Sequence, residues 1–389
     1  MKNKNIQISH IKANREANFE LLRIVAMFMI VVLHYLVRAQ ALFQEGVAIS
    51  GYNIAGSLIE SFCIVSVNVY VLISGYYLVN KGCRLRSLGL LWGQVWFYAL
   101  LIPVLLLLIG ELVLPAENKL YHIMFYILPI STEHYWFMTA YVLMFLVMRF
   151  CTGGLKRITK RSYKLGLIML FLIMCVLQTA TPFRLVIDNY GYDFGWFIFL
   201  FLLGAYIRLY GLKLFEDKNP EDVDLNNPDQ KKTTGTVTKK KNTKNRGLLV
   251  YVISALAAFA LSFMSTKLEV SYYIDAPFYY NFLFSLTGAV GLFYFFKGMK
   301  TNLGGGLFER ICLTVAPFTL GVYLLHEHID IRDKWFVWLG TLLGEVSYGS
   351  VMSLLGHLIL YCGIIFVVGI VSDAIRCAIF SKFEKFMSA

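Results

Sequence analysis

About ten apolar runs, each long enough to cross a lipid bilayer, constrain this sequence more than any other feature. They lie near residues 19–38, 54–79, 88–110, 134–151, 163–180, 194–211, 247–265, 277–297, 311–328 and 347–374. A hydrocarbon core of about 30 Å requires a spanning helix of about 20 residues. In lipid every backbone polar group must be paired within the protein, which a helix achieves by itself. The sequence therefore predicts an all-α integral membrane protein, a bundle of about ten transmembrane helices.

The composition agrees with a membrane protein. Of the 389 residues, 58% are apolar and 15% are charged, whereas a soluble domain is about 25% charged. The stretch near 120–130 is apolar but too short to span, so we expect a re-entrant or interfacial segment there. The first run lacks a small-residue cleavage site, so it is predicted to be a retained span and not a secretory signal.

Lys and Arg residues gather in alternate loops, which predicts the orientation of the chain. They fall in the N-terminal segment 1–18, near 81–86 and 156–164, in 213–246, near 297–300 and after 376. Cytoplasmic loops carry such an excess, so both termini are predicted to be cytoplasmic in a multi-pass protein of the cell membrane. The net charge of +12 then lies mostly on one face, where membrane lipid is the expected partner. Nucleic acid is excluded because no soluble basic domain is predicted.

One long polar segment, residues 213–246, interrupts the apolar runs and is acidic at first and basic later. It cannot bury enough apolar surface to fold, so it is predicted to be a flexible cytoplasmic loop. It divides the membrane domain into spans 1–6 (19–212) and spans 7–10 (247–375), before a cytoplasmic tail at 376–389. The seven Cys residues have no metal-binding spacing and none lies in a predicted outside loop, so neither a disulfide nor a zinc site is expected.

The first apolar run carries ionisable residues, which are costly inside a bilayer. Arg23 and His34 are eleven residues apart, which places them on one helix face, roughly 16 Å apart along the axis. Glu20 and Arg38 extend this stripe by three and four residues. Spacing alone leaves two interpretations open. Either the stripe lines a functional cavity, or the arginines reach the two interfaces and the histidine bonds a neighbouring carbonyl.

Three further segments carry recurring residue patterns. The segment 67–79 is VNVYVLISGYYLV with Ser74, Gly75 and Tyr76, 134–147 is HYWFMTAYVLMFLV with Trp136, Phe137 and Tyr141, and 320–332 is LGVYLLHEHIDIR with Tyr323, Leu324 and His326. Together with the Arg23–His34 spacing, and in this order, they resemble the bacterial membrane acyltransferase 3 family. The resemblance covers essentially the whole membrane region.

The resemblance implies O-acyl transfer: an acyl group, most often acetyl from acetyl-CoA, moves to a hydroxyl of a surface polysaccharide, its lipid-linked precursor or another envelope glycan. Acyl-CoA would be a co-substrate, with no tightly bound cofactor and no metal. A sugar hydroxyl is a poor nucleophile, and a histidine with an ordinary pKa of about 6.5 can accept its proton. His34 is therefore the predicted general base or acyl-handling group. Arg23 is predicted to bind a CoA phosphate or hold the charge of the site, and Arg38 is interpreted as an interfacial residue.

The remaining candidate residues form two groups. The predicted acceptor-binding residues are His326, Glu327, Trp136, Tyr141 and Ser74. The predicted CoA-binding residues are Arg84, Arg86, Arg157 and Lys156. Each has an ordinary alternative, because inside cations set topology, aromatic residues form interfacial belts and Ser74 beside Gly75 permits close helix packing. The implied partners are acyl-CoA, a glycan or glycolipid acceptor, membrane lipid, and either envelope-biosynthesis proteins or a second copy of the chain.

Two other functions compete with acyl transfer. A transporter or flippase of a glycan or lipid-linked precursor could also use an intramembrane Arg/His stripe. We find no internal repeat and no pair of helices broken by Gly or Pro, which argues against a transporter. A non-catalytic scaffold in an envelope assembly is the third possibility, and it requires neither Arg23 nor His34.

Overall fold

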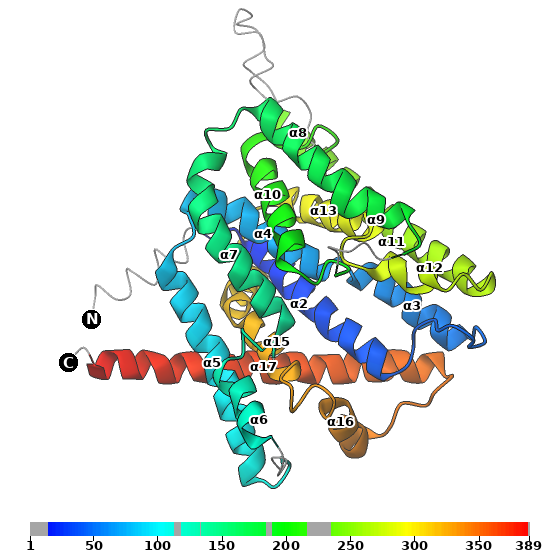
Figure 1. The fold of residues 1–389 in the computed structure, drawn as a ribbon, viewed down its shortest axis with the longest axis vertical. Coiled ribbons are helices and arrows are strands. Elements are labelled where there is room, and N and C mark those ends of the chain that lie inside the picture. The colour runs from blue at the N-terminus through cyan, green and yellow to red at the C-terminus, as the bar shows by residue number, and fades with distance from the viewer. Residues whose placement is uncertain (1–14, 113–117, 133, 184–188, 216–234, 388–389) are drawn as a thin grey trace, which may run out of the picture.

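The computed structural model describes residues 15–112, 118–132, 134–183, 189–215 and 235–387, and this part of the chain contains helices and no strand (Figure 1). Nine of its helical segments are long and apolar enough to cross a membrane. A tenth, Phe194–Tyr210, is apolar but has 17 residues. These segments coincide with the predicted runs, which confirms the all-α, multi-span architecture.

The helices, in chain order, are α2 (Ala17–Arg38), α3 (Gly51–Cys63), α4 (Ser66–Lys81), α5 (Leu85–Leu108), α6 (Lys119–Ile127), α7 (Trp136–Leu155), α8 (Lys160–Phe171), the π-helical turn η1 (Leu172–Val176), α9 (Leu177–Ala180), α10 (Phe194–Tyr210), α11 (Gly235–Lys267), α12 (Tyr272–Asp275), the 3₁₀ turn η4 (Ala276–Phe278), α13 (Leu283–Lys297), α14 (Leu307–Val315), the 3₁₀ turn η5 (Ala316–Phe318), α15 (Thr319–His326), α16 (Trp335–Leu343) and α17 (Val351–Met387). The nine residues of α6 agree with the short, non-spanning segment predicted near 120–130.

Two spans are broken at the same tripeptide, Ala-Pro-Phe. Residues Ala276–Phe278 form η4 between α12 and α13, and Ala316–Phe318 form η5 between α14 and α15. Proline lacks a backbone N–H and its ring clashes with the preceding turn, so Pro277 and Pro317 interrupt the α-helical hydrogen bonds. The inference that the chain has no helices broken by proline was therefore wrong. Hydropathy averages over a whole window, so a single turn of altered helix leaves no mark on it.

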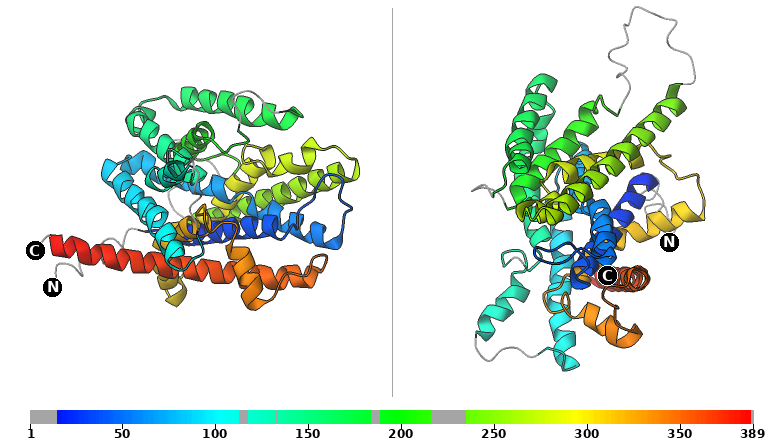
Figure 2. Two further views of the ribbon diagram at one scale, coloured as in Figure 1. Left: turned by 60° about the horizontal axis from the view of Figure 1, so that its bottom comes forward. Right: turned by 90° about the vertical axis from the view of Figure 1, so that its right-hand side faces the viewer.

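Helix α2 lies inside the bundle and packs against α3, α4, α13, α14, α15 and α17. Figures 1 and 2 show the long α17 running beside it. The α2 residues Leu22, Ala26, Val31 and Leu36 are fully buried. An ionisable stripe on a helix enclosed in this way faces protein side chains and not lipid alone, which favours the functional interpretation of the stripe.

Two glycines bring α4 and α10 into direct backbone contact. A Cβ atom placed on Gly75 would lie 2.1 Å from the carbonyl oxygen of Phe201, and one on Gly204 would lie 2.3 Å from the carbonyl oxygen of Leu72. Small residues allow such close approach between membrane helices, where apolar burial alone does not drive association. The close-packing role considered for the Ser74–Gly75 step is thus seen at Gly75.

We expect Gly75→Ala to destabilise the protein by roughly 3 kcal/mol, because the added methyl group overpacks a rigid backbone contact. Gly93 is the matched control, since a Cβ atom there meets nothing within 4 Å. Gly93→Ala should leave thermal stability unchanged or raise it, because alanine is the better helix former. Thermal unfolding of the two purified variants in detergent checks this, and an equal melting temperature would contradict the packing described.

The predicted segment boundaries differ from the helices at two places. Of the predicted loop 213–246, residues 216–234 lie outside the described part of the chain, and α11 already begins at Gly235. No proline follows Pro228 before the apolar run, so nothing stops the helix from extending into the polar residues. Likewise α17 continues to Met387, through most of the predicted tail 376–389. Residues 1–14 of the predicted N-terminal segment lie outside the described residues.

Candidate functional site

A cluster of three side chains forms where α2 meets the end of α15. His34, one turn before the end of α2, places its Nδ1 atom 2.8 Å from Nε2 of His326 and 3.1 Å from Oε1 of Glu327. His326 is the last residue of α15 and Glu327 is its C-cap. The fold thus brings together residues that are almost 300 positions apart in the sequence. Two of the predicted acceptor-binding residues, His326 and Glu327, lie against His34, the predicted base.

The hydrogen bonds assign the protons of this cluster. Nδ1 of His326 lies 2.6 Å from the carbonyl oxygen of Val322, which can only accept, so this nitrogen carries a proton. Neutral His326 then has a lone pair on Nε2, and Nδ1 of His34 must donate to it. The proton of neutral His34 therefore sits on Nδ1, toward His326 and Glu327. Its Nε2 atom retains the lone pair that a general base needs.

Arg38 belongs to the same cluster. Its Nη2 lies 3.5 Å from Oε1 of Glu327, its Nη1 donates to the backbone carbonyl of His34 at 3.1 Å, and its guanidinium lies 5.4 Å from the ring centre of Trp335. Burial raises the pKa of Glu327, and the neighbouring His326 and Arg38 oppose that rise. Arg38 is thus a partner of the site and not simply an interfacial residue. The signal in the sequence was its spacing of four residues from His34 on one helix face.

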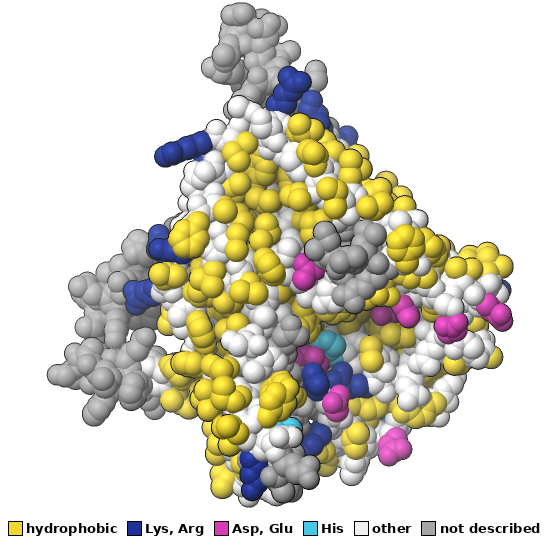
Figure 3. All heavy atoms as spheres, in the orientation of Figure 1, with side chains coloured by type: hydrophobic (Ala, Val, Ile, Leu, Met, Phe, Trp, Pro, Cys, Tyr) yellow, Lys and Arg dark blue, Asp and Glu magenta, His cyan; other side chains and the backbone are white. Residues whose placement is uncertain are grey.

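The cluster opens to the surface of the protein. On the face drawn in Figure 3, His, Lys/Arg and Asp/Glu side chains gather in a hollow over α2 and α16, while hydrophobic side chains cover most of the rest. The His34 side chain is 24% exposed. A polar substrate can therefore reach the cluster from outside the bundle.

The spacing of the three side chains favours hydrogen bonding over metal binding. Ligand atoms of His34, His326 and Glu327 all lie within 4.8 Å of one another, the one such group in the described part of the chain. Two nitrogens bound to one zinc ion at about 2.1 Å would lie roughly 3.4 Å apart, whereas these nitrogens are at hydrogen-bond distance, 2.8 Å. Arg38 also adds positive charge beside the carboxylate. The arrangement fits a hydrogen-bonded site better than a bound cation.

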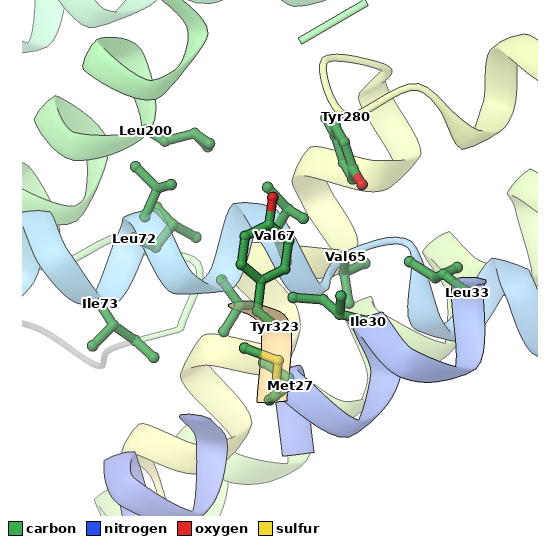
Figure 4. Close-up of a cluster of buried hydrophobic side chains, with 14 of the residues drawn as sticks. Met27, Ile30, Leu33, Val65, Val67, Leu72, Ile73, Leu200, Tyr280 and Tyr323 are labelled. Atoms are coloured by element: carbon green, nitrogen blue, oxygen red, sulfur yellow. The ribbon is translucent and has the colours of Figure 1, made fainter. Parts of the chain in front are cut away.

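A narrow apolar pocket extends from His34 into the bundle. Its other lining residues are Met27, Ile30, Val67, Tyr70, Trp136, Phe137, Tyr280, Leu320 and Tyr323. Figure 4 shows Met27 and Ile30 of α2 meeting Val67 and Tyr323 in this region. The pocket places Trp136, a predicted acceptor-binding residue, in the same space as His34.

Arg23 lies at the opposite end of the stripe and does not touch His34. Its Nη1 atom is 2.5 Å from Oε1 of Glu20, which also pairs with Arg15 at 3.1 Å. The hydroxyl of Tyr70, a lining residue of the pocket, donates to the Arg23 backbone carbonyl at 2.7 Å. The two residues thus share one face of a continuous helix, as predicted, but belong to two separate clusters, and Arg23 does not line the pocket.

The other predicted residues fall in different places. Ser74 and Tyr141 lie 3.1 Å apart through their hydroxyls, and Ser74 also donates to the carbonyl of Tyr70. Neither Ser74 nor Tyr141 lines the apolar pocket. The predicted CoA-binding residues are exposed near the ends of α5 and α7: Arg84, Arg86, Lys156 and Arg157.

The sequence did not predict a group of cations around two adjacent tyrosines of α4, Tyr76 and Tyr77. Side chains from four helices lie over these rings, and we call this set the tyrosine–cation cluster: Arg23, Lys81, Arg208 and Lys297. Arg208 also donates to the hydroxyl of Tyr76 at 2.9 Å. Arg23 alone was among the predicted site residues. Lys81 follows Tyr77 by four residues on α4, whereas Arg208 and Lys297 come from other helices, and no spacing in the sequence links them to the tyrosines.

Two buried histidines hold the loop that follows Glu327. Nε2 of His134 accepts from the backbone N–H of Ile329 at 3.4 Å, and Nδ1 of His328 accepts from the backbone N–H of Asp330 at 3.2 Å. Burial lowers the pKa of His134 to about 4 and that of His328 well below its ordinary value. Both rings are therefore neutral near pH 7 and can accept these bonds, which fix the backbone next to the cluster.

Comparison with known protein families identifies the chain. The family model described as "Acyltransferase domain" matches residues 16–374, which include His34, His326, Glu327, the first eight candidate spans, the shorter apolar helix Phe194–Tyr210 and most of the last span. No curated protein and no solved structure matches the chain. The match agrees with the resemblance carried by Arg23, His34 and the three later motifs. The chain therefore belongs to the membrane acyltransferase 3 family, and it is an acyltransferase.

Proposed function

We propose that the chain moves an acyl group, most simply acetyl, from acyl-CoA to a hydroxyl of a cell-surface polysaccharide or its lipid-linked precursor. The proposal is based mainly on the tautomer of His34, that is, on which ring nitrogen carries the proton. Its Nδ1–H donates to His326, with the carboxylate of Glu327 3.1 Å from the same nitrogen, and this leaves a lone pair on Nε2 of a histidine that lines the apolar pocket. A histidine in this state can take the proton of an attacking hydroxyl.

In the proposed reaction the acceptor hydroxyl attacks the carbonyl carbon of the thioester. Its proton passes to Nε2 of His34 as the C–O bond forms. Glu327 stabilises the resulting imidazolium through Nδ1–H, 3.1 Å from its carboxylate. The C–S bond then breaks, and Nε2 returns the proton to the departing sulfur of CoA. The products are the O-acyl ester and free CoA, and His34 ends in its starting state.

The apolar pocket marks the path that we propose for the donor. Its volume of about 40 Å³ is smaller than a pantetheine arm, so the helices that line it would have to move apart when the donor binds. The pocket reaches from His34 to Tyr70, whose hydroxyl bonds the Arg23 carbonyl. Arg23 and His34 are separated by roughly 16 Å along α2, a length that an extended pantetheine arm can cover. The thioester would then lie beside His34 while the CoA phosphates remain near Arg23.

The tyrosine–cation cluster supports this placement of the donor. Its cations come from four helices and meet at the end of the bundle where Arg23 lies. Glu20 pairs with Arg23, and Glu16 accepts from the Tyr77 hydroxyl, so two carboxylates neutralise part of the charge. The remaining positive charge suits the several phosphate charges of CoA. We propose this cluster, in place of the four exposed cations of α5 and α7, as the phosphate site.

Replacing Arg208 with Ala should raise KM for acyl-CoA by about tenfold, because one charge-assisted hydrogen bond to a phosphate is lost. Arg161→Ala is the matched control, since Arg161 is an exposed cation on α8 outside the cluster. Initial rates of CoA release at varied acyl-CoA concentration measure both constants. An equal KM in the two variants would remove Arg208 from the phosphate site.

A mass comparison of envelope glycans tests the proposed function. Cells without the protein should export glycan that lacks one O-acyl mass per modified residue, and a plasmid carrying the chain should restore it. Glycan of normal composition held inside the cell would instead indicate a transporter or flippase. The proposal also requires the tyrosine–cation cluster at the cytoplasmic face of the cell membrane, where acyl-CoA is made, and thus a cytoplasmic N-terminus.

A further inference from the structure

A second cavity, distinct from the apolar pocket, adjoins the cluster around His34. It has a volume of about 300 Å³ and lies between the end of α2, α16, the segment that follows α16, and α17. Arg38 lines it and is also bonded to the His34 carbonyl and close to Glu327. One side chain is therefore shared between this cavity and the proposed reaction centre.

The lining of this cavity combines aromatic rings with carboxylates. Phe336, Tyr348 and Tyr361 provide rings, and Asp333 and Glu345 provide carboxylates. Aromatic faces pack against the C–H faces of sugar rings, while carboxylates accept hydrogen bonds from neighbouring hydroxyls. Ligand cavities begin at about 300 Å³, a size that suits one sugar residue.

The charges at the cavity point to one class of sugar. The positive charge of Arg38 is shared between Glu327 at 3.5 Å and Asp333 at 3.7 Å. Asp333 also lies 3.7 Å from Arg332, and its side chain is 80% exposed. Glu345 makes no ion pair within the described part of the chain, so its negative charge is uncompensated. A uronic acid or a sialic acid would be repelled here, whereas a neutral sugar or an amino sugar would not.

We propose that this cavity binds a neutral or amino sugar residue of the acceptor glycan, next to the residue that is acylated. The inference rests on the proposed acyl transfer for its biological role, but binding in the cavity can be measured without catalysis. It assigns acceptor recognition to four residues that do not line the apolar pocket: Arg38, Asp333, Glu345 and Tyr348. The neighbouring sugar of the acceptor and the donor then occupy different cavities, while the acylated residue itself reaches Nε2 of His34.

The test is calorimetric titration of the full-length protein in lipid nanodiscs. The ligands are three tetrasaccharides, built from N-acetylglucosamine, from glucosamine and from galacturonic acid. We expect the first two to bind and the third to bind at least about tenfold more weakly. Glu345→Gln should weaken binding of the glucosamine tetramer about tenfold and should strengthen binding of the galacturonic acid tetramer. Glu269→Gln, at an exposed carboxylate outside the cavity, is the matched control and should behave as the wild type.

Two outcomes would overturn the assignment. One is equal binding of the acidic and neutral tetramers, and the other is an unchanged affinity for all three sugars in Glu345→Gln. A separate assay with acyl-CoA distinguishes this failure from failure of the proposed reaction. Charge-selective binding without any O-acyl product would refute acyl transfer to these sugars and leave the cavity assignment standing. O-acyl product with the same acceptor KM in Glu345→Gln and Glu269→Gln would refute the cavity and support the reaction.

Discussion

We expect His34→Ala to lower kcat for acyl transfer by about a thousandfold. Without the imidazole no lone pair remains to take the hydroxyl proton, and the neutral hydroxyl attacks the thioester slowly. KM for acyl-CoA should change little, because the proposed phosphate site is the tyrosine–cation cluster, which does not include His34. Purified protein, acyl-CoA and a glycan acceptor suffice for the measurement, with the ester product followed by mass.

The control for this substitution is His122→Ala. His122 is a partly exposed histidine on α6, and it lies outside the cluster and outside both cavities. It should keep the wild-type rate. A His34→Ala protein that elutes as a single species and still acylates at the wild-type rate would exclude His34 as the base.

The second large effect concerns Glu327, a positioning residue that acts through His34. Glu327→Gln should lower kcat by about a hundredfold and leave KM for the donor near its original value. The amide keeps the shape of the side chain but removes the charge that stabilises an imidazolium at 3.1 Å and pairs with Arg38. Glu327→Asp, which keeps the charge, should recover part of the rate.

A double variant separates this role from a general loss of structure. If Glu327 acts through His34, adding Glu327→Gln to His34→Ala should reduce the remaining rate by much less than a hundredfold. Glu111→Gln removes an exposed carboxylate elsewhere and should be neutral in both backgrounds. Multiplicative losses in the double variant would mean that Glu327 stabilises the fold and not the proton transfer.

The sequence predicted the spans and one face of one helix because both depend on local periodicity. Run lengths located every spanning segment, and the eleven-residue spacing placed Arg23 and His34 on one side of α2. The same reasoning could not find the partners of that face. Arg38 contacts Glu327 because α15 ends beside it. The spacing of residues within α2 contains no information on where α15 ends.

His326 was predicted as a site residue because its motif resembles that of a known family. Lys81, Arg208 and Lys297 had no such motif, and in sequence each is simply a cation near the end of a span. They meet only because α4, α10 and α13 pack together, partly through the backbone contact that Gly75 allows. Tertiary packing therefore supplies the part of the site that periodicity and motifs could not.

Transfer of an acyl group from acyl-CoA to a glycan hydroxyl by means of His34 can be measured directly. The assay uses proteoliposomes that contain only this protein, acetyl-CoA labelled in its acetyl group and an envelope glycan acceptor. We predict label on the glycan as an ester that mild alkali releases, and none when His34 is replaced by Ala. Label that never leaves acetyl-CoA, while the glycan crosses the bilayer unmodified, would contradict the proposed reaction.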